Sequence, residues 1–332
     1  MLSSTGALFV MILVSLLWGS WFQSVKHIGN YPIVAFMRWV YIFSVPVIWV
    51  PILFLQKTMI PAGLVNELTA DPLRTLFVLI CGCFFAIGMQ MHLTVVGRIG
   101  LILSTSVSAS CCILSGTAIS AFFGGIPEGS SLGKLLFCSL LLILATIVCQ
   151  LSGSSRDADR AKNAEAAENK EEKSRLGDIL LLVFINTVLI SAYSLALSVG
   201  LASELRPNGM SSLSCMGVLA IGCVIGANIF ASVQLRKEGV DGSLRAQGSK
   251  KGVILLMAFI AACCHFGGNV LQAIAAPVIS VVVATVMGNS YHVWSYVWGI
   301  VYGEYKGASV KTYAILACGV ALFLAGVLLL AI

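Results

Sequence analysis

The sequence predicts an all-α integral membrane protein with ten transmembrane helices arranged as two inverted five-helix repeats. Hydrophobic residues make up 58% of the 332-residue chain and charged residues only 10%, whereas roughly a quarter of the residues in a soluble domain are charged. Ten apolar stretches are each long enough to cross a bilayer, because about 20 helical residues span a hydrocarbon core of about 30 Å. The stretches are residues 5–25, 31–55, 73–96, 98–123, 132–152, 178–203, 209–235, 252–274, 276–303 and 308–332.

Each stretch is expected to form a helix and not a strand of a barrel. Backbone polar groups in lipid must pair within the protein, and these apolar runs are longer and more continuous than the alternating strands of a barrel. The first stretch has no basic region ahead of it, lacks a clear cleavage site and carries Trp18 and Trp21. We therefore expect it to remain as the first transmembrane helix and not to be removed as a signal peptide.

Basic residues are distributed unevenly between the two sets of alternate loops. Fifteen Lys and Arg residues lie in the loops that follow the first, third, fifth, seventh and ninth stretches, and only four lie in the other loops. Because cytoplasmic loops are enriched in Lys and Arg, the first set of loops is expected in the cytoplasm and both termini outside. The sequence thus predicts a multi-pass protein of the lipid bilayer, and the family resemblance described below implies that this is a bacterial inner membrane.

The stretches divide the chain into a first repeat at 1–152, a charged cytoplasmic linker at 153–177 and a second repeat at 178–332. The linker mixes six basic with six acidic residues, which is typical of a solvated, partly helical connection. No segment contains a glycine-rich phosphate-binding loop, so nothing indicates ATP-driven transport. Basic loops that face anionic lipid explain the formal net charge of +6 without any nucleic-acid partner.

The third and fourth stretches of the two halves can be overlaid at a constant offset of 179 residues, which aligns GMQ at 88–90 with GGN at 267–269. Since each half holds five helices, the second half must enter the membrane from the opposite side. Inverted repeats are common in secondary transporters, because two equivalent halves can open a midplane site alternately to either face. The alternative is a duplication that was kept only for packing.

Polar residues inside the spans are candidates for a solute path, because each is costly in lipid unless it faces the bundle interior. In the eighth and ninth stretches they recur at helical spacing, which places them on one face of each helix. The first and third stretches add further amide and indole groups. The predicted substrate-binding residues are Trp18, Trp21, Gln23, Gln90, His265, Asn269, Gln272, Asn289, His292 and Tyr296.

Amide, imidazole and hydroxyl groups beside indole rings suit a neutral polyhydroxylated solute. Hydrogen bonds would fix its hydroxyl groups, and aromatic rings would cover its apolar C–H face. For each amide or hydroxyl taken singly, hydrogen bonding between helices is an equally good explanation. Two polar faces on neighbouring helices favour the solute site for the set as a whole.

Coupling to a proton gradient requires a group that gains and loses a proton near working pH, and histidine is the side chain best suited to this. The candidates are His265, His292 and Glu304, although Glu304 lies at the predicted end of a helix, where a surface or capping role is equally expected. Arg38, inside the second stretch, must be paired or hydrated. It is expected to bind ligand oxygens, to pair with Glu304 or to balance a helix C-terminus.

No metal or other cofactor is predicted, apart from a proton or another cation as the coupling ion. All eleven cysteines lie within predicted spans, where they are expected to act as small apolar packing residues. The CxxC pairs typical of a zinc site are absent from the sequence. The expected partners are a small polar solute and the bilayer, and the protein is expected to be a monomer or a homodimer.

Several segments resemble a known group of transporters. These are LLWGSWFQSVKHIGNYP in the first helix and loop, MHLTVVGRIGLILSTSVSASCCILSGTAISAFFGG, GCVIGANIFASVQLRK, and NSYHVWSYVWGIVYGEYKGASVKTY near the carboxyl end. With the ten-span pattern and an arginine early in the second span, they resemble the drug/metabolite transporter superfamily. Within it, the chain is most similar to the L-rhamnose/proton symporter and glucose/ribose porter families.

The resemblance implies uptake of a sugar or similar small polar solute, driven by a cation gradient through alternating access between the two halves. It does not identify the solute. Export of a metabolite or drug, as in other members of the superfamily, is the first alternative. The second is a polytopic membrane enzyme that acts on lipid-linked sugars, but the sequence lacks His and Asp pairs at catalytic spacing, so no enzymatic activity is expected.

Overall fold

The computed structural model describes residues 2–99, 101–126, 130–163, 176–203, 206–288 and 291–331, and its regular elements are all helices. The first half of the chain forms α1 (Ser4–Trp21), η1 (Phe22–His27), α2 (Ile33–Met59), α3 (Leu64–Ala70), α4 (Pro72–Ile99), α5 (Leu101–Gly124) and α6 (Leu132–Asn163). The second half forms α7 (Leu176–Gly200), α8 (Ser212–Glu238), η2 (Leu244–Lys250), α9 (Lys251–Ile279), α10 (Val281–Gly288), α11 (His292–Val301) and α12 (Val310–Ala331).

The described helices have the length and surface of a membrane protein. Seven of them are long and apolar enough to cross a bilayer, and two shorter apolar helices cover Ser110–Gly124 and Phe184–Gly200. Large apolar side chains remain exposed on the outside, among them Phe54 at 81% and Phe122 at 83%, which water would disfavour but lipid does not. The prediction of an all-α, multi-pass membrane protein is therefore confirmed.

The ninth apolar stretch is not the single continuous helix that hydropathy predicts at 276–303. Instead α9 continues through Pro277 to Ile279, and the chain then turns at Ser280, where φ is 78°. The Ser280 hydroxyl accepts a hydrogen bond from the Val283 amide at 3.3 Å and caps α10. Hydropathy misses the break because the residues on both sides of it are apolar, and α10 and α11 share the predicted span.

Close packing between α4 and α8 depends on glycine. A Cβ atom at Gly222 would lie 2.0 Å from the backbone oxygen of Leu79, and one at Gly226 would lie 2.3 Å from the backbone oxygen of Cys83. Any larger residue would push the two helices apart. Small residues of this kind let membrane helices approach to backbone contact, and here they hold a helix of the first half against one of the second.

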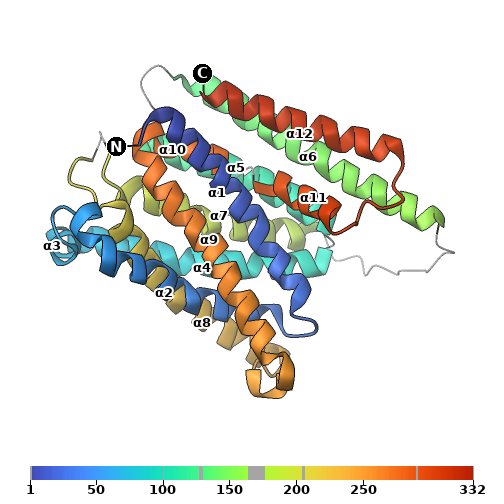
Figure 1. Cartoon of the computed structure of the whole chain (residues 1–332), viewed down its shortest axis with the longest axis horizontal. Helices are drawn as coiled ribbons and strands as arrows, with labels where there is room; N and C mark the ends of the chain where they lie inside the picture. Colours follow the sequence, from blue (N-terminus) through green and yellow to red (C-terminus); the bar gives the residue numbers. More distant parts are fainter. Residues whose placement is uncertain are drawn as a thin grey trace.

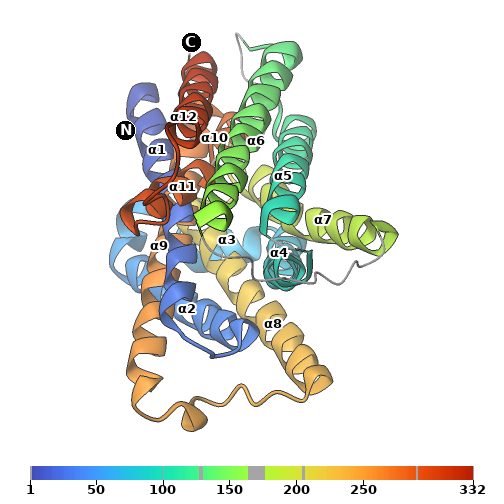
Figure 2. The same ribbon diagram turned by 90° about the vertical axis from the view of Figure 1, so that its right-hand side faces the viewer.

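In the remaining contacts, corresponding helices of the two halves pack on corresponding partners in the other half. Helix α4 packs on α7 and α8, and α9 packs on α1 and α2. Likewise α5 packs on α7, and α10 and α11 pack on α1. The pair α6 and α12 lies side by side at the edge of the bundle, on the opposite side from α2 and α8 (Figure 1, Figure 2).

Figure 1 also shows where the chain ends lie. Helix α1 begins and α12 ends on the left of the view, on the side that holds α3, whereas α6 ends and α12 begins on the right. Helix α6 continues to Asn163, past residue 152, where the apolar stretch ends.

Candidate functional site

A small cavity lies at the centre of the bundle, among helices of both halves. Its volume is about 50 Å³, enough for a few water molecules but well below the roughly 300–1,000 Å³ typical of ligand pockets. The described residues that line it are Trp18, Trp21, Phe85, Met89, His92, Cys112, Ile190, Ser191, Tyr193, Ser194, His265, Asn269 and Tyr291. A sugar-sized molecule would therefore fit only if the cavity widened.

Two polar side chains of α9 in this cavity lack hydrogen-bond partners. His265 and Asn269 are one helical turn apart and only 5% and 0% exposed. Within the described part of the chain, neither imidazole nitrogen of His265 and neither amide atom of Asn269 has a hydrogen-bond partner. A buried polar group left unpaired costs about 1–3 kcal/mol, so these atoms are the best-placed groups in the described structure to bind a polar solute.

Aromatic rings surround His265. The Trp21 ring meets the imidazole edge-on with centroids 5.1 Å apart, and the Phe85 ring stacks on it at 5.8 Å with an interplanar angle of 20°. Trp18 donates a hydrogen bond from Nε1 to the backbone oxygen of His265 at 3.1 Å and contacts the Tyr193 ring edge-on at 5.8 Å. The cavity therefore combines a few buried hydrogen-bonding atoms with extensive aromatic walls.

The position of Trp18 is fixed by two glycines of the second half. A Cβ atom at Gly268 in α9 would lie 2.5 Å from Trp18 Nε1, and one at Gly288 in α10 would lie 2.8 Å from Trp18 Cζ3. The indole ring thus occupies a slot that only glycine leaves open on both sides. Movement of α1 relative to α9 and α10 must carry Trp18 with it or displace it from this slot.

Four of the predicted binding residues, Trp18, Trp21, His265 and Asn269, line the cavity together. Gln272 lies behind the cavity wall, where its Oε1 accepts a hydrogen bond from Tyr193 at 2.8 Å and its Nε2 donates to the backbone oxygen of Ala284 at 3.1 Å. Its amide therefore holds α7 and α10 against α9 and orients Tyr193.

Gln90 is buried, but it does not line the cavity. Its Nε2 donates to the backbone oxygen of Ala227 in α8 at 3.2 Å. The offset alignment places Gln90 opposite Asn269, yet α4 is rotated so that Met89, the neighbour of Gln90, faces the cavity together with Phe85 and His92. Gln90 and Asn269, which the offset alignment matches, therefore do not both line the cavity.

The other predicted binding residues lie elsewhere. Gln23 is in η1 and Tyr296 in α11 is hydrogen-bonded to Gln150 of α6, and neither is among the residues that line the cavity. Asn289 lies outside the described residues. His292 is the first residue of α11, but its side chain is not among those described.

The charged candidates also lie away from the cavity. Glu304 follows α11 and accepts hydrogen bonds from Lys26 and from Arg156, the latter at 2.9 Å. Burial alone would raise the pKa of the Glu304 carboxyl, but the hydrogen bonds and charges of Lys26 and Arg156 hold that pKa below its ordinary value. Arg38 does not meet Glu304, because its Nη2 donates to the Ser232 hydroxyl of α8 at 3.2 Å.

Cavity residues that the sequence did not single out come chiefly from α4, α7 and the start of α11. Phe85 and Met89 share one face of α4 with His92, at the same spacing that identified His265 and Asn269 on α9, but both are apolar and were therefore missed. Tyr193 and Tyr291 are single aromatic residues that do not continue a polar face at helical spacing, so they carry no signal of their own. In the part of the chain that the structure describes, no group of three His, Cys, Asp or Glu side chains is placed to hold a metal ion.

No protein-family model matches the chain, and no curated protein matches it in sequence.

Proposed function

We propose that the protein is a secondary transporter that moves a small neutral polar solute through the central cavity by alternating access. In this proposal the chain crosses the membrane ten times as two inverted five-helix repeats of the drug/metabolite transporter type, with α10 and α11 together forming the ninth span. The matching contacts of the two halves support it, because α4 packs on α7 and α8 as α9 packs on α1 and α2, and α5 packs on α7 as α10 and α11 pack on α1. Such matching contacts are expected when two equivalent halves enclose a shared site.

The observation that carries the proposal is the pair His265 and Asn269. Both side chains are buried in the cavity, and their polar atoms have no hydrogen-bond partners within the described residues. Buried polar groups of a membrane helix that served only to join helices would be paired. A solute that enters the cavity would supply the missing partners, and its departure would leave them unpaired again.

The chemistry of the cavity favours a neutral solute such as a sugar. No Asp, Glu, Lys or Arg is among the described residues that line it, so an ion would enter without a counter-charge. The tryptophan and tyrosine rings offer faces for the C–H surface of a sugar, and His265, Asn269 and Ser194 offer hydrogen bonds to its hydroxyl groups.

The coupling ion is proposed to be a proton, with His265 and His292 as the candidate carriers. Glu304 is less suited to this role, because Lys26 and Arg156 stabilise its ionised state. The linker and the end of the bundle that holds Glu304 are placed in the cytoplasm of a bacterial cell, so that transport proceeds as uptake.

Thermal unfolding of the purified protein in detergent tests the cavity as a binding site. Across a panel of neutral sugars, nucleobases and amino acids, at least one neutral sugar is expected to raise the melting temperature of the wild type, because a ligand that binds only the folded state stabilises it. Asn269→Ala should abolish that rise. Asn228→Ala is the matched control, because the Asn228 amide donates to Val224 within α8 at 2.8 Å and lies outside the cavity lining. An equal rise in both variants would show that the solute binds elsewhere.

A further inference from the structure

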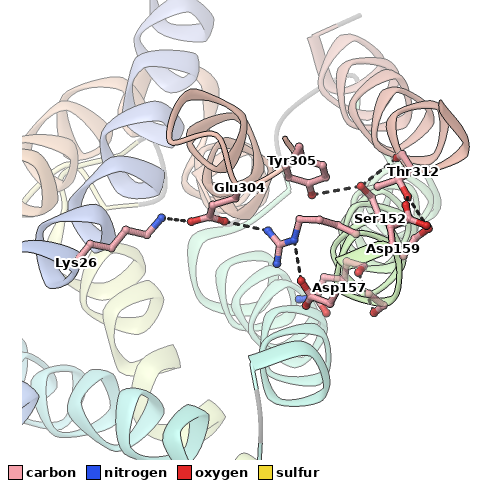
Figure 3. A network of polar contacts seen from close by, with 11 residues as sticks. Lys26, Ser152, Asp157, Asp159, Glu304, Tyr305 and Thr312 are labelled. Carbon is pink, nitrogen blue, oxygen red and sulfur yellow. Dashed lines mark hydrogen bonds and ion pairs between the residues drawn. The ribbon is translucent and has the colours of Figure 1, made fainter. Parts of the chain in front are cut away.

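A charged network ties the two halves together at one end of the bundle. One carboxylate, Glu304, joins two cations of the first half: its Oε1 pairs with Lys26 of η1, and its Oε2 pairs with Arg156 of α6 at 2.9 Å (Figure 3). We call the end of the bundle that holds Lys26, Arg156 and Glu304 the linker face. Glu304 belongs to the second half, so the network spans the junction between the halves.

The backbone around Glu304 is shaped to present its carboxylate. The Glu304 amide donates to the backbone oxygen of Gly299 at 2.8 Å, which closes the turn after α11. Gly303 and Gly307 have φ values of 70° and 81°, which glycine adopts without strain. A Cβ atom at Gly299 would lie 3.1 Å from Glu304 Oε2. The glycines of the GEYKG segment thus hold Glu304 where it reaches both cations.

Arg156 lies on a part of α6 that is hydrogen-bonded to α12. The α6 segment that carries Arg156 is joined to the start of α12, because Asp159 accepts hydrogen bonds from the Ser309 amide at 2.9 Å and from the Thr312 hydroxyl at 2.8 Å. Ser152 donates to the backbone oxygen of Thr312 at 3.2 Å (Figure 3). Opening at Arg156 would therefore have to separate α6 from α12, or move both together.

The Lys26 side is held more lightly. Lys26 lies in the six-residue helix η1, which continues directly from α1. Its ammonium group is 4.4 Å from the centre of the Tyr302 ring, and His27 is 3.3 Å from the Tyr302 hydroxyl. The Lys26 and Glu304 side chains are 41% and 32% exposed, and ion pairs with this much exposure are weak. The ion pair at the junction between η1 and the turn after α11 is thus weak, and separation there must also break the hydrogen bonds, both at 2.8 Å, by which Trp294 and Trp298 of α11 hold Ser15 and Ser20 of α1.

Helices α1 and α11 connect this junction to the cavity. Trp18 and Trp21, which line the cavity, belong to α1, and η1 with Lys26 follows immediately. Tyr291, which also lines it, immediately precedes α11, and Glu304 follows that helix. Separation of α1 and η1 from α11 would therefore move cavity walls and break the contact between Lys26 and Glu304 in the same motion.

We propose that Lys26, Glu304 and Arg156 form the gate of the linker face. The cavity opens to this side only when the ion pair between Lys26 and Glu304 breaks. Arg156 of α6 keeps its ion pair with Glu304 during this opening. The gate rests on the proposed function for its role in transport. Its effect on access to the cavity is measurable without any solute.

Cys112 provides the measurement, because this partly exposed thiol lines the cavity. Membrane vesicles of known orientation are treated at the linker face with a charged, membrane-impermeant maleimide, and modification of the Cys112 peptide is followed by mass spectrometry. Glu304→Gln and Lys26→Gln are each expected to raise the rate of Cys112 modification at least threefold over wild type. Asp71→Asn, which alters an ion pair with Arg74 only three residues away, is expected to leave the rate unchanged.

Reversal of the charges completes the test. The triple variant Lys26→Glu, Glu304→Lys and Arg156→Glu keeps two opposite charges beside the central one and should return the modification rate to that of the wild type. If both single variants, shown to be folded by their melting temperatures, modify Cys112 at the wild-type rate, the gate is refuted. Because no solute is present, that result would leave the proposed transport function standing. Loss of solute binding in Asn269→Ala would likewise leave the gate standing.

Discussion

The two ends of the bundle are closed by different chemistry. At the linker face the closing contacts join charged side chains to one another, through Glu304 and its two cations. At the opposite end, which we call the α3 face and define by Glu67, Arg74 and Arg206, charged side chains instead hold backbone groups. Arg206 donates to the backbone oxygens of Phe123, at 2.6 Å, and Ser198.

The other two residues of the α3 face act in the same way. Arg74 donates to the backbone oxygen of Asn208, and the Ser211 amide donates to Glu67 at 2.9 Å. A contact between two side chains can break while every backbone segment keeps its fold, whereas a contact to a backbone group fixes the segment that carries it. We therefore expect the linker face to open by displacement of whole helices. Opening of the α3 face should instead require a change in the backbone of the segment between α7 and α8.

The largest effect is expected between the two ends, at the slot that holds Trp18. Gly268→Ala should displace the indole ring and weaken solute binding at least tenfold, with a loss of unfolding free energy of about 1–3 kcal/mol, as is typical of overpacking. Gly267→Ala is the matched control, because a Cβ atom there meets nothing within 4 Å. Binding measured by titration calorimetry should separate the two variants, and equal affinities would show that the position of Trp18 does not matter.

At the α3 face, Arg206→Ala should destabilise the fold. Hydrogen bonds to charged groups contribute about 1.5–3 kcal/mol, so a loss of free energy of this size is expected, seen as a lower melting temperature in detergent. Lys26→Gln should cost at most about 1 kcal/mol, because exposed ion pairs contribute little. The contrast between the ends would be wrong if the two variants lost equal stability.

Salt provides a smaller and reversible test of the same contrast. Raising the ionic strength from about 0.01 M to about 1 M shortens the screening length from about 30 Å to about 3 Å. Modification of Cys112 from the linker face should then rise about twofold in the wild type, since the partly exposed pair of Lys26 and Glu304 is screened. In Glu304→Gln the rate should not respond to salt. An equal response in both proteins would mean that salt acts elsewhere.

The smallest effect concerns pH. The pKa of Glu304 lies below its ordinary value of 4.5, so the ionised carboxylate contributes to closure above that value, and the contribution is lost only as the pH falls through the lowered pKa. Other charged and titratable groups around the network are Lys26, Arg156, Asp157 and His27. To remove the imidazole of His27, both proteins compared carry His27→Gln. The Cys112 modification rate of the double variant His27→Gln and Glu304→Gln, divided by that of His27→Gln alone, should stay constant between pH 8 and about pH 6. A ratio that falls within this range would show that Glu304 is protonated there.

The sequence predicted the helices and part of the cavity well, because these depend on local patterns. Long apolar runs identified the long helices of a multi-pass membrane protein, and polar residues one turn apart on an apolar helix identified His265 and Asn269 as cavity residues. The rotation of α4 was not predictable from an offset alignment. Alignment fixes position along a helix, while the close contact of Gly222 and Gly226 with α4 helps to decide which face of α4 meets α8.

Contacts between residues far apart in the chain could also not be predicted from the sequence. Glu304 was identified as a charged residue at a helix end, but its partners Lys26 and Arg156 are 278 and 148 residues away along the chain. Of the three roles expected for Arg38, pairing with Glu304 does not match the structure, in which Arg38 donates to Ser232. The break at Ser280 was hidden because valine and alanine continue across it, and backbone conformation leaves no trace in hydropathy.

In the proposed function, the cavity around His265 and Asn269 carries the transported solute. This role is tested most directly by uptake into proteoliposomes, under an imposed pH gradient, of the sugar that best stabilises the purified protein. We expect accumulation above the external concentration by the wild type and by Asn228→Ala, and none by Asn269→Ala. Accumulation by Asn269→Ala at the wild-type rate, or no accumulation of any sugar in the panel by the wild type, would contradict it.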